Sequence, residues 1–150
     1  MHTNNAAGAI TRLLDWGVEP FLVASSVIGS VAQRLVRTIC PRCRRSRILE
    51  MDAPERLTFR LPPRRIEVWE GAGCHLCGET GFRGRTGLFE VLRVTPAVRE
   101  LINARASSDA VHAKAVEEGM VPLLEDGVEK ALEGITTLAE VQRVAFYEER

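Results

Sequence analysis

The chain has 150 residues, of which 45% are hydrophobic and 27% are charged, and its formal net charge is zero. This composition is typical of a globular protein with one ordinary domain or two small ones, and the balanced charge excludes a global attraction to nucleic acid. No apolar run approaches the roughly 18–20 residues that a membrane span needs, and the N-terminus lacks the pattern of a secretory signal.

The first 39 residues predict two helices. Asn4 or Asn5 caps a helix that ends before Gly17. A second helix is predicted from Pro20 to about residue 38, because apolar residues recur at spacings of three and four. These residues are Val23, Val27, Ile28, Val31 and Leu35. The second helix is expected to run straight into Cys40.

The middle of the chain predicts short strands. Residues 44–65 are polar, basic and rich in proline, and they allow at most a short helix near Pro54. The alternation in "RIEVWEG" predicts a strand, and "RTGLFEVLRV" predicts another one after a series of glycines.

From Thr95 onward the pattern changes to four helices. Thr95 precedes Pro96 as a helix start, and a serine cap opens the next segment, which ends at Gly119. A third segment ends at Gly134. The last segment opens with a threonine and a glutamate in capping-box spacing, Thr137 and Glu140. Four short amphipathic helices are expected to pack together into one subdomain.

All four cysteines of the chain lie in two Cys-x-x-Cys pairs, Cys40 with Cys43 and Cys74 with Cys77. Two such pairs form a tetrahedral zinc site with bonds of about 2.3 Å, and four ligands leave no position for a substrate. The predicted site is therefore structural. Its formal charge of about −2 would be offset by arginines nearby. These are Arg42, Arg44, Arg45 and Arg47.

Two other interpretations of the cysteines are a redox pair and plain buried thiols. No βαβ pattern accompanies the motifs, and no cysteine is left over, so the zinc site is favoured. The histidines are weaker candidates for ligands. His75 lies between Cys74 and Cys77 but is expected to face water, and His112 is expected to be a solvated side chain on a polar helix.

The stretch from "MHTNNAAGAITRLLDWG" to "LVRTICPRC" resembles the C-terminal half of the secretion ATPases that drive type II secretion and type IV pilus assembly. The segments "GCHLCGETGFRGRTGLFEVL" and "GITTLAEVQRV" resemble the second cysteine pair and the closing helix of the same family. The resemblance covers nearly the whole chain in the right order. It implies that His2, Thr3 and Asn4 fall on the histidine box of the family, which lies near the ATP phosphates.

The resemblance also implies the fold class: an α/β fragment at the C-terminal edge of a RecA-like P-loop NTPase core, with a four-cysteine zinc insert and an α-helical C-terminal subdomain. Residues 1–39 would belong to the core, 40–78 to the insert, 79–94 to a strand returning to the core, and 95–150 to the helical subdomain. The complete enzyme would be a hexamer that uses ATP and Mg²⁺, with His2 as a catalytic residue.

The sequence departs from the family in one important respect. No G-x-x-x-x-G-K-[ST] motif, which would bind the ATP phosphates, occurs in the chain. We therefore expect a fragment that begins at the histidine box and does not hydrolyse ATP alone. Its expected location is cytoplasmic, peripheral to the inner membrane, with secretion or pilus platform proteins as partners and no nucleic acid. The alternative function is a free-standing zinc-ribbon adaptor that binds nucleic acid or protein through the arginine-rich residues 34–65.

Overall fold

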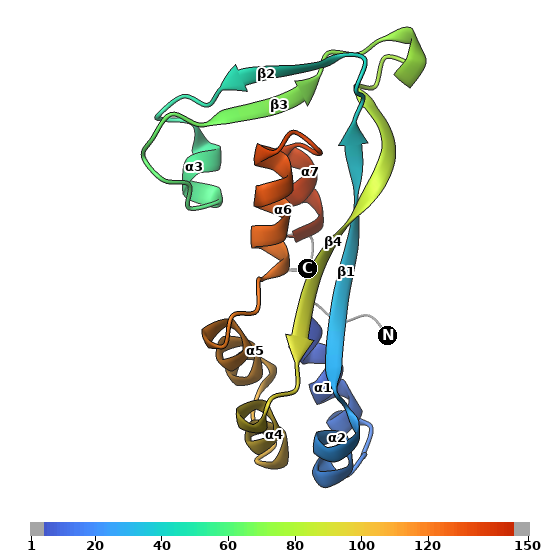
Figure 1. The fold of residues 1–150 in the computed structure, drawn as a ribbon, viewed down its shortest axis with the longest axis vertical. Helices are drawn as coiled ribbons and strands as arrows, with labels where there is room; N and C mark the ends of the chain where they lie inside the picture. The colour runs from blue at the N-terminus through green and yellow to red at the C-terminus, as the bar shows by residue number, and fades with distance from the viewer. Residues whose placement is uncertain (1–4, 146–150) are drawn as a thin grey trace. The chain divides into compact units, whose positions relative to one another are not determined.

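The structure is a computed structural model, and it describes residues 5–145 (Figure 1). Helices and short strands both occur, which confirms the expected α/β class. The helices are α1 (Ala6–Asp15), α2 (Pro20–Ser26), α3 (Pro54–Thr58), α4 (Pro96–Asn103), α5 (Ser108–Glu117), α6 (Leu123–Leu132) and α7 (Leu138–Ala145). The strands are β1 (Gly29–Ile39), β2 (Arg44–Ile48), β3 (Glu67–Gly71) and β4 (Phe82–Arg93). None of the helices in this part of the chain is both long enough and apolar enough to cross a membrane.

The strands form two small sheets. Strand β1 pairs with β4, and the two run in opposite directions (Figure 1). Strand β2 pairs with β3 in antiparallel register, from Arg44 opposite Gly71 to Ile48 opposite Glu67. The strand expected over "RIEVWEG" and the one after the second cysteine pair are confirmed as β3 and β4, and the short helix near Pro54 is α3.

The chain folds into two compact units. Unit 1 contains the residues up to Gln33 together with Phe89–Leu123, so it holds α1, α2, α4 and α5. These helices pack in the pairs α1 with α2, α1 with α5, α2 with α4 and α4 with α5. The apolar side chains that they bury include Ile10, Val23, Leu92, Val98, Ile102 and Val111.

Unit 2 contains Arg34–Leu88 and the residues from Leu124 onward. Its core brings side chains of α6 and α7 together with side chains from the segment between Leu49 and Val68. The buried members are Leu49, Phe59, Ile66, Val68, Ala131, Leu138 and Val141. All four cysteines lie in this unit.

The predicted helix from Pro20 to about residue 38 is wrong after its first two turns. Helix α2 ends at Ser26, and the chain then continues as strand β1. This strand buries Ala32 and Val36, but Val31 and Leu35 point to its other side and are 61% and 50% exposed. Apolar residues on both faces hide the period of two that marks a strand, and their three- and four-residue spacing imitates a helix.

The helices expected after Thr95 are present, and their caps are formed as the sequence indicates. The hydroxyl oxygens of Thr95, Ser107 and Thr137 accept hydrogen bonds from backbone N–H groups at the starts of α4, α5 and α7. The two units divide these helices between them, with α4 and α5 in unit 1 and α6 and α7 in unit 2. The prediction that all four helices pack together into one subdomain is therefore wrong, and nothing in the sequence indicates this division.

Candidate metal centre

The four cysteines, which lie far apart in the sequence, meet at one place in unit 2. Their Sγ atoms all lie within 4.8 Å of one another. The distances are 3.9 Å from Cys40 to Cys74, 3.9 Å from Cys43 to Cys77, and 3.7 Å from Cys74 to Cys77. A sulfur tetrahedron around zinc with bonds of about 2.3 Å has edges of about 3.8 Å. The thiols are therefore positioned to bind a metal ion, and the donor set is consistent with zinc.

The number of converging thiols argues against the redox interpretation. A disulfide joins two sulfurs, whereas here four sulfurs come together at one point. The interpretation as plain buried thiols also fails, since only Cys40 is buried and the other three are partly exposed. A converging, partly exposed set of four thiols fits a metal site better than it fits a core.

Tight turns of the backbone aim the sulfurs inward. In the first pair, the N–H of Cys43 donates to the carbonyl of Cys40 at 3.3 Å, and in the second pair Cys77 donates to Cys74 at 3.1 Å. The sulfur of Cys77 also accepts hydrogen bonds from the N–H groups of Cys74 and Gly81, both at 3.3 Å. Hydrogen bonds of this kind orient metal-ligating groups and stabilise the thiolate form.

These surroundings shift the pKa values of the Cys43 and Cys77 thiols in opposite directions. Desolvation raises the pKa of Cys43 to about 11, and the neighbouring thiols add to this effect, although one hydrogen bond from Gly73 opposes it. Desolvation would also raise the pKa of Cys77, but the N–H donors of Cys74 and Gly81 outweigh it and lower the pKa to about 6. Cys77 is therefore the more easily ionised of these two thiols, and an ionised thiol is the form that binds metal.

Two glycines allow the backbone to cross next to the cysteines. The backbones of Gly71 and Gly81 are so close that a Cβ on Gly71 would lie 2.0 Å from the carbonyl oxygen of Gly81. A Cβ on Gly81 would in turn lie 2.5 Å from the carbonyl oxygen of Gly71. The same carbonyl of Gly81 accepts the N–H of Cys40 at 2.9 Å. Gly81 therefore contacts both cysteine pairs, the first through the N–H of Cys40 and the second through the sulfur of Cys77.

We expect Gly71→Ala to destabilise unit 2 by at least about 2 kcal/mol and to weaken metal binding, because only backbone movement can relieve the clash. Urea unfolding and a competition titration with a zinc chelator would measure the two effects. Gly78→Asn is the matched control, since Gly78 has a φ of 62° but open space around it. The control is expected to change stability by less than about 1 kcal/mol. Equal effects of the two substitutions would contradict this account of the crossing.

The arginines near the first cysteine pair contact other groups of unit 2. Arg44 donates to the carbonyl of Gly134 at 3.2 Å and lies over the ring of Trp69, 4.3 Å from its centre. Arg45 pairs with Glu70 at 2.9 Å, and Arg47 pairs with Glu55 at 3.6 Å. Buried Arg56 donates to four backbone carbonyls. Much of the basic segment 34–65 therefore has a structural role within its own unit.

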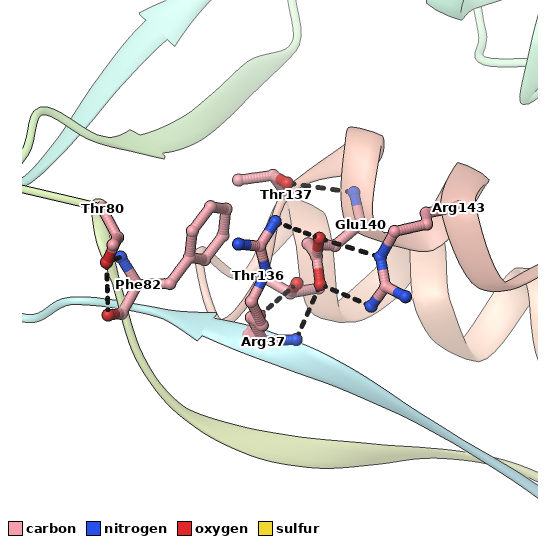
Figure 2. Close-up of polar contacts among 7 residues, drawn as sticks. All are labelled: Arg37, Thr80, Phe82, Thr136, Thr137, Glu140 and Arg143. Atoms are coloured by element: carbon pink, nitrogen blue, oxygen red, sulfur yellow. Dashed lines mark hydrogen bonds and ion pairs between the residues drawn. The ribbon is translucent and has the colours of Figure 1, made fainter.

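A buried carboxylate ties helix α7 to strand β1 (Figure 2). The side chain of Glu140 is only 3% exposed, and it accepts the backbone N–H of Arg37 at 2.9 Å and the guanidinium of Arg37 at 2.7 Å. Arg143 donates to it from the next turn of α7, at 3.0 and 3.2 Å. The guanidinium of Arg37 also lies over the ring of Phe82, 4.2 Å from its centre.

These donors set the ionisation of Glu140. Burial by itself would raise the pKa of the carboxyl, but the hydrogen bonds from Arg37 and Arg143 outweigh burial and lower the pKa to about 2. The expected capping box is half formed: Thr137 accepts the N–H of Glu140 at 3.1 Å, whereas the carboxylate turns to the arginines. The sequence indicates Glu140 only as part of a helix start, and Arg37 lies in the segment for which the sequence predicts a helix.

The predicted histidine sites have different outcomes. His2, Thr3 and Asn4 lie outside the described residues. His75 is exposed and is not part of the cysteine cluster. His112 is only partly solvated: its side chain is 28% exposed, but its Nδ1 atom is buried and lies 3.8 Å from a carboxylate oxygen of Glu90. A polar helix pattern could not show that one side of α5 faces a buried acid.

Comparison with known proteins supports the resemblance that the sequence shows. The chain is 43% identical over 144 residues to the type II secretion system protein E of Aeromonas hydrophila. It is 43% identical over 145 residues to the type II secretion system ATPase E of Vibrio cholerae. Each alignment covers 96% of this chain and 28% of the relative, so the chain spans less than a third of the length of these relatives.

A pilus protein is similarly close. The chain is 42% identical over 146 residues to the type IV pilus assembly ATPase PilB of Thermus thermophilus. This alignment covers 94% of this chain and 16% of the relative. A model of the family described as type II/IV secretion system protein matches residues 1–143. The chain therefore belongs to the type II/IV secretion system protein family.

Proposed function

We propose that this chain is the C-terminal portion of a hexameric ATPase that powers type II protein secretion or type IV pilus assembly. The observation that carries the proposal is the similarity over 94–96% of the chain to ATPases of both systems. In the complete enzyme, ATP and Mg²⁺ are the cofactors and His2 lies beside the ATP phosphates. The chain alone hydrolyses no ATP in this proposal, because it has no phosphate-binding loop of the G-x-x-x-x-G-K-[ST] type.

The parts of the chain have different roles in this proposal. Residues 1–39 and the strand in 79–94 belong to the ATPase core, and residues 95–150 form the helical C-terminal region. The segment 40–78 holds zinc through Cys40, Cys43, Cys74 and Cys77. Zinc has a structural role there, because four thiolates complete a tetrahedron and leave no open position for a substrate.

The partners follow from the same proposal. The complete enzyme contacts other copies of itself and the inner-membrane platform proteins of the secretion or pilus system, from a cytoplasmic position peripheral to that membrane. Nucleic acid is not a partner, because Arg44, Arg45, Arg47 and Arg56 have contacts within unit 2. With family membership established, the zinc-ribbon adaptor has no observation of its own in its favour.

A chimera tests the proposal. The segment of the Vibrio cholerae ATPase E that aligns with this chain would be replaced by residues 1–145, and ATP hydrolysis and hexamer formation would be measured. We expect both to be retained, with turnover within about tenfold of the parent, because the two sequences are 43% identical over 145 residues.

Two further proteins serve as controls for the chimera. The 150-residue chain alone is expected to show no turnover above background, and the chimera with His2→Ala is expected to lose turnover while it still forms hexamers. A folded chimera that neither assembles nor hydrolyses ATP would contradict the proposed function.

A further inference from the structure

The two cysteine pairs of the candidate metal centre differ in exposure. Cys40 is buried at 0% exposure, whereas Cys43, Cys74 and Cys77 are partly exposed. Of the two pairs, the second is therefore the one in which both cysteines are open to reagents dissolved in water. Its two sulfurs also lie close together, 3.7 Å apart.

The backbone around the two pairs also differs. The first pair lies between strands, because β1 ends directly before Cys40 and β2 begins directly after Cys43. Cys74 and Cys77 instead lie in the connection between β3 and β4, where the regular structure is a single 3₁₀ turn. Loops change conformation at lower cost than paired strands. The second pair can therefore move its sulfurs together more easily than the first.

Bound zinc would keep all four sulfurs in a reactive form. A metal-bound cysteine is a thiolate, and the thiolate is the form that oxidants attack. Ionisation therefore does not distinguish the four sulfurs once zinc is bound, so exposure and backbone freedom decide which of them react. A four-thiolate site is not a redox pair at rest, but it can respond to an oxidant by losing its metal.

Hydrogen bonds distinguish the two sulfurs of the second pair. The sulfur of Cys77 accepts the N–H groups of Cys74 and Gly81. Within residues 5–145, the sulfur of Cys74 accepts one N–H, that of Cys77, which also donates to the carbonyl of Cys74. N–H donors stabilise a thiolate, and a more stabilised thiolate is a weaker nucleophile. Cys74 is therefore the stronger nucleophile of the two.

We propose that Cys74 and Cys77 form an oxidation site for reagents of the peroxide class, and that oxidation there releases the zinc. The Cys74 thiolate attacks one oxygen of hydrogen peroxide, so that an S–O bond forms, the O–O bond breaks and hydroxide leaves. The Cys77 thiolate then attacks the sulfur of Cys74, so that an S–S bond forms and a second hydroxide leaves.

The electrons and protons of this sequence balance. The two thiolates together lose two electrons, which the peroxide gains, and two protons from the solvent convert both hydroxides to water. Cys40 and Cys43 then remain as two ligands, too few for a closed tetrahedral site. The inference rests on the zinc site of the proposed function and is independent of ATP hydrolysis.

The test uses the 150-residue chain, loaded with one molar equivalent of zinc and treated with one equivalent of hydrogen peroxide. A chromophoric chelator follows zinc release relative to a sample without peroxide, and the cysteines are then alkylated and mapped by mass spectrometry. We expect about one zinc to be released per peroxide consumed, a Cys74–Cys77 disulfide, and alkylation of Cys40 and Cys43. A dithiol reductant with added zinc should restore the site.

Two variants that keep four ligands test the role of Cys74. Histidine replaces one cysteine in Cys₃His zinc sites, so Cys74→His and the matched control Cys43→His are both expected to retain zinc. Peroxide should release zinc about tenfold more slowly from Cys74→His, which lacks the reactive pair. Release from Cys43→His, which keeps this pair, should stay within about threefold of the parent rate. If either variant does not hold zinc, the mapping of the unsubstituted chain decides.

The outcomes separate the inference from the proposed function. A parent chain that binds no zinc would overturn the zinc site of the proposed function, and the inference with it. A zinc-loaded chain in which peroxide joins other cysteines, or releases no zinc at this dose, would overturn the inference alone. Equal release rates from zinc-loaded Cys74→His and Cys43→His would do the same. A Cys74–Cys77 disulfide that forms together with stoichiometric zinc release would support it.

Discussion

Cys74→Ser is expected to abolish metal binding and to unfold the backbone around the cysteines. The purified parent chain should carry about one zinc ion, as a closed four-thiolate site requires. Binding of structural zinc provides about 10–16 kcal/mol in small zinc-binding peptides, comparable to the whole stability of a domain, which is about 5–15 kcal/mol. The segment near Cys74 has few apolar side chains of its own, so we expect the metal to account for most of its order.

Loss of the metal should first unfold the backbone near the cysteines and leave the rest of unit 2 folded. Unit 2 has a separate apolar core, to which Leu49, Val68 and Val141 contribute. Hydrogen exchange is therefore expected to become fast in residues 72–81 of Cys74→Ser, or of the parent with a chelator, while amides near this core remain protected.

The matched control is His75→Ala, which changes the exposed neighbour of Cys74 and leaves four thiols. It should keep its zinc and its exchange pattern. If His75→Ala lost the metal, or if the metal-free parent exchanged as slowly as the zinc form, the four-cysteine site would not hold this segment.

Glu140→Ala is expected to destabilise unit 2 by about 2–3 kcal/mol. The substitution leaves the backbone N–H of Arg37 without its acceptor and removes the charged hydrogen bonds from Arg37 and Arg143, whose side chains are about half exposed and return to water. Urea unfolding of the metal-bound chain at neutral pH would measure the loss.

The same carboxylate predicts how stability depends on pH. The pKa of Glu140 is lowered from 4.5 to about 2 in the folded chain, so the unfolded chain takes up the proton first as pH falls. Its contribution is therefore complete above pH 4.5 and is lost as pH falls through 2. A shift of this size corresponds to about 3 kcal/mol.

Glu140→Gln should remove this part of the acid dependence. Glu129→Gln, on an exposed position of α6, is the control that should keep it. A parent chain and a Glu140→Gln variant with the same acid dependence between pH 4.5 and 2 would show that the ion pair does not stabilise the fold. Because acid also protonates thiolates and releases zinc, the comparison is made with chelator present in all samples.

The sequence predicts correctly those features that depend on residues close together in the chain. Each Cys-x-x-Cys pair forms a tight turn within four residues, and each threonine or serine cap depends only on the next three residues. The sequence therefore predicts both the cysteine turns and the helix caps correctly. Strand β1 was missed because its apolar residues lie on both faces. Its conformation depends on pairing with β4, which is about 50 residues away in the chain.

Contacts between residues far apart in the chain produce no local sequence pattern, so the sequence does not predict them. Arg37 and Glu140 are 103 residues apart, and Ala6 and Glu90 are 84 residues apart. In the sequence, each glutamate looks like any acid on a helix or strand. Only the fold shows that both are buried and that each one joins two elements.

The division of the chain into two units has a consequence for its synthesis. The chain enters unit 2 after Gln33, returns to unit 1 at Phe89 and leaves it again after Leu123. Neither unit is one continuous stretch, and β1 and β4 each run through both. On the ribosome, unit 1 cannot close until α5 has emerged, and by then most of unit 2 is already made and still lacks α6 and α7. Domains that are continuous in sequence fold one after another as they emerge. Here unit 1 has to wait until residues 34–88 of unit 2 have been made, and unit 2 then has to wait for α6 and α7.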